Sequence, residues 1–193
     1  MIYNDLSSLL LFGEIIVILL LPMTLYALLL AAAVVSSNKD IHPIAPVKRD
    51  TKAFLDAMAM RESGNDPKAV NQFGYLGKYQ FSMSTLRTMK VKTTKYRFLH
   101  DEQLQDSVMK AYLRDQWASM WRMHKYVGRH IHGVKITKSG MLAAAHLIGV
   151  GGVCTMFEPT RCNYPTKDGN GVDGLEYLRK FANYEVSLTT QEK

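Results

Sequence analysis

One carboxylate in the sequence is a candidate proton donor. Glu62 falls on the last turn of an expected helix, just before the helix-stopping Gly64. Three aromatic residues that follow, Tyr75, Tyr79 and Phe81, could shield it from water. Desolvation raises the pKa of a carboxyl group and keeps it protonated, which suits an acid that protonates the leaving oxygen of a glycosidic bond. Position alone favours an exposed helix-end carboxylate, so the choice depends on other motifs.

Three segments supply those motifs. The first joins residues 60–65 (MRESGN) to residues 73–81 (FGYLGKYQF), the second is residues 140–153 (GMLAAAHLIGVGGV), and the third is residues 168–181 (DGNGVDGLEYLRKF). In order and spacing they resemble the lysozyme-like superfamily, specifically the catalytic domain of soluble lytic transglycosylases. In that family a helix ending in Glu-Ser is followed by Gly-x-x-Gln, then Ala-Tyr-Asn-Ala-Gly, then a late Tyr.

The match is uneven along the chain. Gly77-x-x-Gln80 fits the family pattern closely. In the middle motif His146 and Leu147 stand where the family has Tyr and Asn, although the glycines that follow keep register. Glu-Ser alone would carry no weight, but the three motifs together cover residues 54–184 and favour Glu62 as the functional carboxylate.

The resemblance implies a fold and a set of site residues. The fold is mainly α, of the lysozyme-like α+β type, with a small β-hairpin near the active site. Glu62 is implied as the general acid and base, and the residues implied at the sugar groove are Ser63, Gly77, Tyr79, Gln80, His146 and Tyr177. Ser63 would orient Glu62 or a sugar amide. His146 is either a groove contact or a buried structural histidine, and Tyr177 either hydrogen-bonds near Glu62 or packs the final helix.

The number of nearby carboxylates separates two reactions. An inverting hydrolase needs a second acid about 6.5–9.5 Å from the first, to activate water. Asp66 is the only acid close to Glu62 in the sequence, and positions 67–100 contain none. This favours the single-Glu mechanism implied by the family, in which the substrate's own acetamido group and 6-hydroxyl displace the aglycone and leave a 1,6-anhydromuramoyl end. Asp66, or Asp168 brought in from afar, keeps hydrolysis as the alternative.

The elements that must position these residues are expected to be helical. Apolar spacing and capping residues predict helices over residues 50–63, from Ser82 or Ser84 to Met89, over 101–126, from Thr137 or Ser139 to about Gly149, and over 173–184, with a possible short helix over 153–157. Residues 66–81 are rich in Gly, Asn, Pro and aromatics and predict turns and a small hairpin.

The N-terminal part of the 193-residue chain has a different composition. Residues 15–35 run 21 positions without a charge, and about 20 apolar residues suffice for a membrane-spanning helix. No Lys or Arg precedes this run, which favours an uncleaved anchor over a signal peptide, although residues 31–33 (AAA) could be a cleavage site. We therefore expect an N-terminal tail (1–14), a transmembrane anchor (15–35), a linker (36–50) and one lysozyme-like domain (51–193). The composition excludes an intrinsically disordered chain and a polytopic membrane protein.

The charges leave the orientation of the domain open. Residues 39–193 contain 24 Lys+Arg and 15 Asp+Glu, a net charge of +9. Basic residues directly after residues 15–35 place the domain in the cytoplasm by the positive-inside rule. A cell-wall substrate instead requires a periplasmic or wall-facing domain, which is our expectation, with a virion membrane as the alternative. Such a basic domain suits an anionic wall surface, and the sequence has no nucleic-acid-binding motif.

The remaining candidates are structural. Cys154 and Cys162 are eight residues apart and could pair outside the cytoplasm. Trp117 and Trp121 share a helical face and are expected in the core. The histidines of one basic stretch, His124, His130 and His132, are expected on the surface rather than at a metal site. Asp168-x-Asn170 lacks the other ligands of a calcium loop.

The sequence thus predicts a membrane-anchored peptidoglycan lytic transglycosylase that cleaves the MurNAc–GlcNAc β-1,4 bond without a cofactor or metal. Its expected partners are glycan strands and a bilayer, together with a secretion, conjugation or virion assembly. Two alternatives remain open: a phage or virion-associated muramidase that hydrolyses the bond, and a wall-binding subunit without activity.

Overall fold

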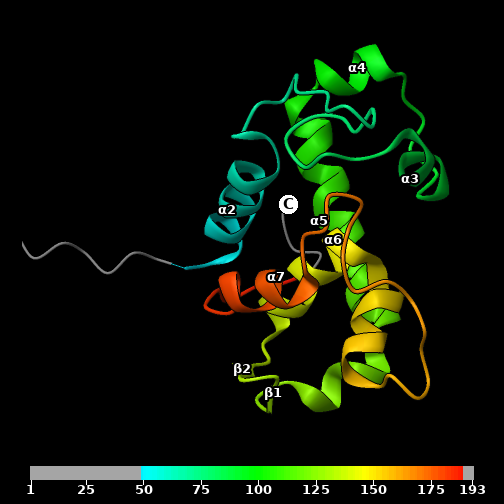
Figure 1. Ribbon diagram of the computed structural model, residues 1–193. Helices are drawn as coiled ribbons and strands as arrows, with labels where there is room; N and C mark the ends of the chain where they lie inside the picture. Colours follow the sequence, from blue (N-terminus) through cyan, green and yellow to red (C-terminus); the bar gives the residue numbers. More distant parts are fainter. Residues whose placement is uncertain (1–48, 189–193) are drawn as a thin grey trace, which may run out of the picture. The chain divides into compact units, whose positions relative to one another are not determined.

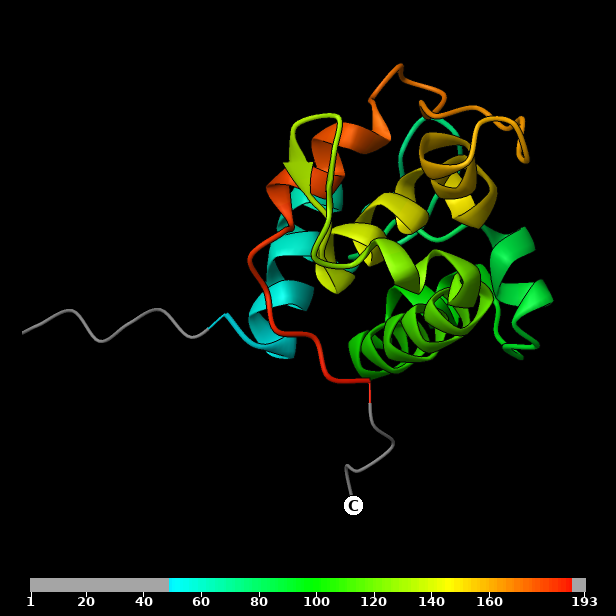
Figure 2. The ribbon, with the colours of Figure 1, turned by 90° about the horizontal axis from the view of Figure 1, so that it is seen from below.

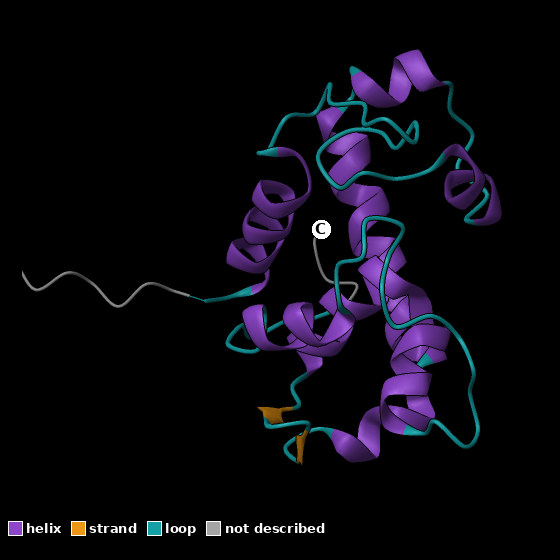
Figure 3. Ribbon diagram, viewed as in Figure 1, coloured by secondary structure: helices purple, strands orange, loops and turns teal. Residues whose placement is uncertain are grey.

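The computed structural model describes residues 49–188, and the described part is mainly helical with one small sheet (Figures 1 and 3). Its helices are α2 (Thr51–Ser63), α3 (Met83–Thr88), α4 (Lys95–Leu99), α5 (Glu102–Ser119), the 3₁₀ helix η1 (Trp121–Tyr126), α6 (Lys138–Phe157) and α7 (Gly174–Lys180). Strands β1 (His130–Ile131) and β2 (Val134–Lys135) pair antiparallel. This confirms the expected helical class, whereas the predicted anchor at residues 15–35 lies outside the described residues.

The helix starts follow from side-chain capping. At the start of each α-helix a Ser, Thr or Asp side chain accepts a hydrogen bond from a backbone N–H two or three residues on, which satisfies a donor that the helix leaves unpaired; these caps are Asp50, Ser82, Thr94, Asp101, Thr137 and Asp173. Five of the six positions were predicted. Helix α4, capped by Thr94, was not, because five residues are too few to show helical periodicity.

Two predicted helix ends are wrong. The helix expected over residues 101–126 ends at Ser119 and continues as the 3₁₀ helix η1. The change of direction buries Met120 and Met123 in the core. The last helix ends at Lys180 rather than at residue 184, and the chain after it turns back to place Phe181 and Tyr184 edge-on against Phe54 of α2.

Helix α6 is the apolar centre of the domain and packs against both α5 and α7 (Figure 2). Its residues 141–145 are fully buried. As the sequence predicted, the first helical segment stops at Gly149, whose φ of 72° and ψ of 167° are not helical, and a second segment follows directly. α6 is also the one described helix that is long and apolar enough to cross a membrane, and 50% of its apolar window is buried inside the domain. Core helices of globular domains share this property.

The predicted hairpin is present only in part. Residues 66–81 form isolated antiparallel bridges, Val70 with Leu76 and Leu76 with Phe81, and cross the upper part of Figure 1 as a loop. The two-stranded sheet lies instead at residues 130–135, at the lower end of the same view. Besides its own backbone bonds, the 66–81 loop is held by side chains of α5, which a local pattern does not reveal.

Gln105 of α5 holds that loop. Its side chain is completely buried, and its Oε1 accepts a hydrogen bond from the backbone N–H of Lys78 at 2.8 Å. Its Nε2 donates to the carbonyl oxygens of Pro67 at 2.9 Å and Phe98 at 2.7 Å. One buried amide therefore satisfies three backbone groups that would otherwise be desolvated without a partner.

An ion cluster lies beside this amide. The side chain of Lys78 is 8% exposed, and its Nζ lies 2.9 Å from both Glu102 Oε1 and Asp106 Oδ1. Asp106 Oδ1 also accepts the hydroxyl of Tyr79 at 2.8 Å. A cation this buried needs such partners, and the cluster fixes the loop to α5 a second time.

We predict that Gln105→Ala lowers the free energy of unfolding by roughly 3 kcal/mol or more, because it orphans a buried N–H and two carbonyls. Urea unfolding followed by tryptophan fluorescence measures the loss. The control is Gln103→Ala, an exposed position two residues earlier on α5, which should stay within about 0.5 kcal/mol of wild type. Equal stability of the two variants would contradict the assigned role.

Candidate active site

A cavity of about 520 Å³ collects polar and aromatic side chains from segments far apart in the chain. Its walls come from the end of α2, the 66–81 loop, the start of α3, α5, α6, the 168–172 loop and α7. The side chains that line it include Glu62, Phe73, Tyr75, Gln80, Tyr112, His146, Asp168 and Tyr177. A cavity with a half-buried carboxylate and a few convergent polar and aromatic side chains is a candidate ligand site.

Glu62 is fixed by Tyr177, 115 residues later in the chain. The hydroxyl of Tyr177 donates a 2.9 Å hydrogen bond to Glu62 Oε1. The neighbouring Arg61 adds a 2.9 Å ion pair to Glu176 of α7, and its guanidinium lies 5.5 Å from the centre of the Tyr177 ring. Both predicted options for Tyr177 hold together, since it packs in the core at 3% exposure and bonds to Glu62.

The hydrogen bond from Tyr177 occupies only one of the two carboxyl oxygens of Glu62. Burial, followed by the nearby charge of Glu62, raises the pKa of Tyr177 well above its ordinary value, so this phenol stays a proton-bearing donor. Because Oε1 accepts that bond, a proton on Glu62 resides on Oε2. No residue of the described range 49–188 donates to Oε2, so it is available to a ligand.

Gln80 lies in the cavity wall in a left-handed backbone conformation, with a φ of 53°. Non-glycine residues rarely adopt this conformation, and they persist in it only where surrounding contacts impose it. Its Nε2 donates to the carbonyl of Gly77 at 2.8 Å, closing a tight turn. The amide oxygen has no donor within residues 49–188 and can accept one from a ligand.

Gly77 shapes the loop and does not line the cavity. Its φ is 73°, and a Cβ there would lie 2.6 Å from Cδ of Gln105. Only glycine combines this backbone conformation with so close an approach to the buried amide. The prediction of a groove contact at Gly77 is therefore corrected to a role in the path of the loop.

Two further site predictions are wrong. Tyr79 is 2% exposed and points to Asp106, away from the cavity. Ser63 does not reach Glu62; its hydroxyl donates to the carbonyl of Lys78 at 2.9 Å and accepts the N–H of Asp66 at 3.1 Å. Both residues tether the 66–81 loop, which explains their place in the motif without a contact to substrate.

His146 lines the cavity and is half-buried, so its position is compatible with a groove contact and with a structural role. Its Nε2 lies 2.9 Å from the backbone oxygen of Tyr79, and since a carbonyl only accepts, Nε2 carries the proton. The rings of Phe81 and Tyr112 meet it edge-on at 5.6 and 5.7 Å. Its Nδ1 is buried and has no partner among the described residues, which leaves an acceptor for a ligand N–H or O–H.

Of the two candidates for a second acid, Asp66 and Asp168, only Asp168 lines the cavity. Asp66 is exposed, closes its own turn by accepting the N–H of Lys68 at 2.8 Å, and does not line the cavity. Asp168 does line it. Its Oδ1 accepts the backbone N–H groups of Asn170 at 2.9 Å and Val172 at 2.8 Å, so the carboxylate also organises its own loop.

Sequence reasoning placed Tyr75 near Glu62 but gave no role to Phe73, which forms an exposed aromatic pair with Tyr75 in the cavity wall. Phe73 and Tyr75 are 53% and 41% exposed, with ring centres 6.3 Å apart. Two large exposed rings in one turn are a signal that the sequence carried, because a loop residue that packs against nothing has another use. Tyr112 of α5 also reaches the cavity, and burial raises its pKa to about 12.

The cysteines and tryptophans singled out in the sequence lie outside the cavity. Cys154 and Cys162 are bonded, with their Cα atoms 5.8 Å apart. Trp117 packs on the core and stacks on His124, but Trp121 is 63% exposed, so its assignment to the core is wrong. The turn from α5 into η1 carries it outward. No group of three or more metal-binding side chains occurs in the described range.

Comparison with protein-family models, curated proteins and solved structures finds no match to this chain.

Tyr79, Tyr112 and Tyr177 should make the domain sensitive to alkali. Burial raises the pKa of each above 10, so the unfolded chain loses these protons first and stability falls as the pH rises above 10. The slope is up to about 1.4 kcal/mol per pH unit for each tyrosine. Urea unfolding between pH 9 and pH 12 should show a shallower slope for Tyr79→Phe. Tyr96→Phe, at a position 73% exposed, should keep the wild-type slope, and identical slopes would contradict the prediction.

Proposed function

We propose that this chain is a membrane-anchored lytic transglycosylase that cleaves the β-1,4 bond between MurNAc and GlcNAc in peptidoglycan. The observation that carries the proposal is the bond between Tyr177 and Glu62 in a cavity that also holds Gln80. Glu62 and Gln80 belong to the first of the three segments that resemble the lytic transglycosylase pattern, and Tyr177 belongs to the third. They converge on one cavity although they are far apart in sequence.

Glu62 acts twice in this mechanism. As an acid, it transfers the proton from Oε2 to the glycosidic oxygen, and the bond from that oxygen to the muramoyl C1 breaks. The acetamido group of the substrate stabilises the positive charge that develops at C1. As a base, the Glu62 carboxylate then takes the proton of the 6-hydroxyl, whose oxygen bonds to C1 and forms the 1,6-anhydro ring. Glu62 ends protonated, as it began.

The neighbours of Glu62 have distinct tasks. Tyr177 holds Oε1 and leaves Oε2 to react, because a neutral phenol donates in both halves of the cycle. The amide oxygen of Gln80 and Nδ1 of His146 are acceptors suited to the N–H and hydroxyl groups of amino sugars. Phe73 and Tyr75 offer ring faces to the apolar faces of the sugars. No metal or cofactor has a part in these steps.

A hydrolytic muramidase is the second candidate, and Asp168 is the observation that favours it. This carboxylate lines the same cavity as Glu62 and could activate a water molecule. Two backbone N–H groups already occupy its Oδ1, which favours a structural role in the 168–172 loop. Transglycosylation therefore remains the leading proposal.

The fold type, the membrane anchor and the cellular context are part of the same proposal. We assign the domain to the lysozyme-like α+β type, and residues 15–35 to a single membrane anchor that holds it near the wall. A secretion, conjugation or virion assembly would use such local wall cleavage, and the net charge of +9 over residues 39–193 suits an anionic wall.

Replacing Glu62 tests the chemistry. Glu62→Gln keeps the size and can still accept the Tyr177 bond, but it cannot donate the proton. Release of soluble fragments from purified peptidoglycan should fall by about 10²- to 10⁴-fold, with unchanged stability. Glu185→Gln, an exposed position outside the cavity, is the matched control and should keep full activity.

The products distinguish the two reactions. Mass analysis should find 1,6-anhydro ends, lighter by one water than hydrolytic products, and Asp168→Asn should keep most activity. Reducing ends together with an inactive Asp168→Asn would establish hydrolysis instead. Absence of any cleavage would favour a wall-binding subunit.

Removal of residues 1–38 tests the anchor. The shortened chain should partition to the aqueous phase and retain peptidoglycan cleavage, whereas the full chain should sediment with membranes. A mature full-length product that starts near Val34 in native membranes would show cleavage of a signal peptide and refute the anchor.

A further inference from the structure

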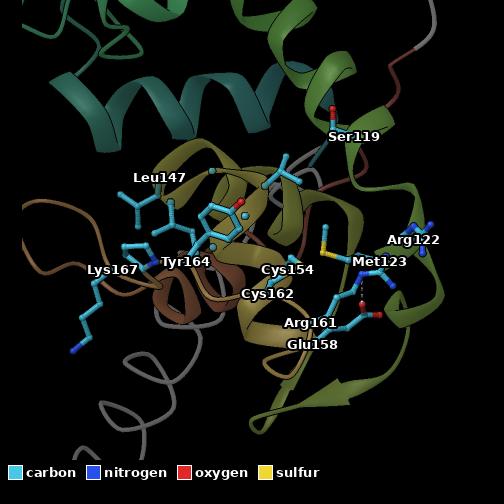
Figure 4. Close-up of a pocket in the computed structure, with 16 residues that line it drawn as sticks. Ser119, Arg122, Met123, Leu147, Cys154, Glu158, Arg161, Cys162, Tyr164 and Lys167 are labelled. Atoms are coloured by element: carbon cyan, nitrogen blue, oxygen red, sulfur yellow. Dashed lines mark ion pairs between the residues drawn. A yellow bond between two sulfur atoms is a disulfide. The ribbon is translucent and has the colours of Figure 1, made fainter.

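A second cavity, of about 640 Å³, adjoins the first and has no part in the proposed chemistry (Figure 4). Leu147 lines both cavities. The walls of the second one come from the end of α5, from η1, from residues on both sides of the break in α6 at Gly149, and from the loop over residues 158–167.

The floor of this cavity is apolar and one wall is aromatic. Met123, Ile148 and Val150 contribute apolar side chains. Tyr164 is 60% exposed, yet its ring lies so close to Gly151 that a Cβ there would be 2.7 Å from the ring. The glycine thus lets an otherwise exposed ring lie flat over the backbone of α6, where Figure 4 shows it beside Leu147.

The loop that carries Tyr164 is held in place. The disulfide joins Cys162 to Cys154 of α6, and the backbone N–H of Tyr164 donates to Thr155 Oγ1 at 2.8 Å. Thr155 in turn donates to the carbonyl of Gly151 at 3.2 Å. A wall fixed by a covalent bond and two hydrogen bonds is formed before any ligand arrives, which lowers the entropic cost of binding.

The cavity has an excess of positive charge. Arg122, Arg161 and Lys167 line it against a single carboxylate, Glu158. Glu158 is already paired with Lys125 at 2.7 Å, and the hydrogen bond from that lysine holds the pKa of Glu158 below its ordinary value. Within residues 49–188, neither Arg122 nor Lys167 forms an ion pair. In Figure 4 these two cations lie toward opposite sides of the aromatic wall.

We infer that this cavity binds a short acidic peptide, specifically the peptide branch of the glycan strand that occupies the Glu62 cavity. Carboxylates of the branch pair with the cations, and its alanyl methyl groups lie on the apolar floor. The wall shared at Leu147 allows one branched polymer to occupy both cavities. The identity of the polymer rests on the proposed function. The affinity of the second cavity for an acidic peptide does not, because it follows from the cations and apolar side chains that line the cavity.

Direct binding tests the site without catalysis. The probe is N-acetyl-L-Ala-γ-D-Glu-meso-diaminopimelyl-D-Ala, which carries more carboxylates than amines, titrated calorimetrically into full-length Glu62→Gln protein. We expect saturable binding that weakens with added salt. When both Arg122→Gln and Lys167→Gln are added to the Glu62→Gln protein, binding of the probe should weaken roughly 5- to 10-fold, since an exposed ion pair contributes little by itself.

Two further variants locate the ligand. Gly151→Ala should weaken binding because its methyl group displaces the Tyr164 ring. Lys180→Gln removes an exposed cation of α7 that does not line the cavity, and it should bind like the parent protein. No binding of the probe, or equal affinity in all variants, would overturn the inference. Binding of peptide-free chitooligosaccharide that depends on Arg122 and Lys167 would also overturn it, since the site would then recognise sugar.

A cleavage assay separates this inference from the proposed function. Wild-type protein should cleave intact peptidoglycan better than glycan stripped of its peptides by an amidase, and the Arg122→Gln/Lys167→Gln variant should lose that preference while cleaving stripped glycan normally. Equal cleavage of both substrates by wild type refutes the inference and leaves the function standing. No cleavage of either substrate refutes the function, and the calorimetric result still decides whether the peptide site exists.

Discussion

The buried amide of Gln105 is the constraint on which the rest of the site depends. It satisfies three backbone groups at once, and two of them lie in the 66–81 loop that supplies Phe73, Tyr75 and Gln80 to the cavity. The loop closes turns of its own, including the pair of backbone bonds between Leu76 and Phe81, and the amide of Gln105 anchors these turns to α5. Gly77 has to be a glycine for the same reason, because only a residue without a Cβ can approach the amide so closely.

Local features of the sequence predicted the helices well. A capping Asp, Ser or Thr next to an apolar periodic stretch placed five of the six α-helix starts, and Gly149 marked the break in α6. The errors arose where distant contacts decide the conformation. The direction of the chain at Met120, the end of α7 and the path of the 66–81 loop all depend on burial against other elements, which periodicity does not encode.

The candidate site was predictable where a motif carried it and not where packing chose the side chain. Glu62 and Tyr177 were named from motifs, and their hydrogen bond spans 115 positions. Tyr79 was assigned to the groove because aromatic rings suit sugars, but its ring is buried and its hydroxyl bonds to the carboxylate of Asp106 on α5. Asp66 and Asp168 were both candidates for a second acid, and only Asp168 lines the cavity, because its loop packs there although no local pattern reveals that position.

The break at Gly149 links the two cavities. His146 lines the Glu62 cavity, Leu147 lines both cavities, and Ile148 to Gly152 line the second one. An unbroken helix would direct successive side chains around a single axis and would keep its backbone covered by side chains. The left-handed glycine, followed by two more glycines, instead exposes the backbone under Tyr164 and redirects the chain. A linear polymer with side branches requires adjoining sites of different character, one polar with a proton donor and one apolar with cations at its rim, and a single broken helix supplies a wall to each.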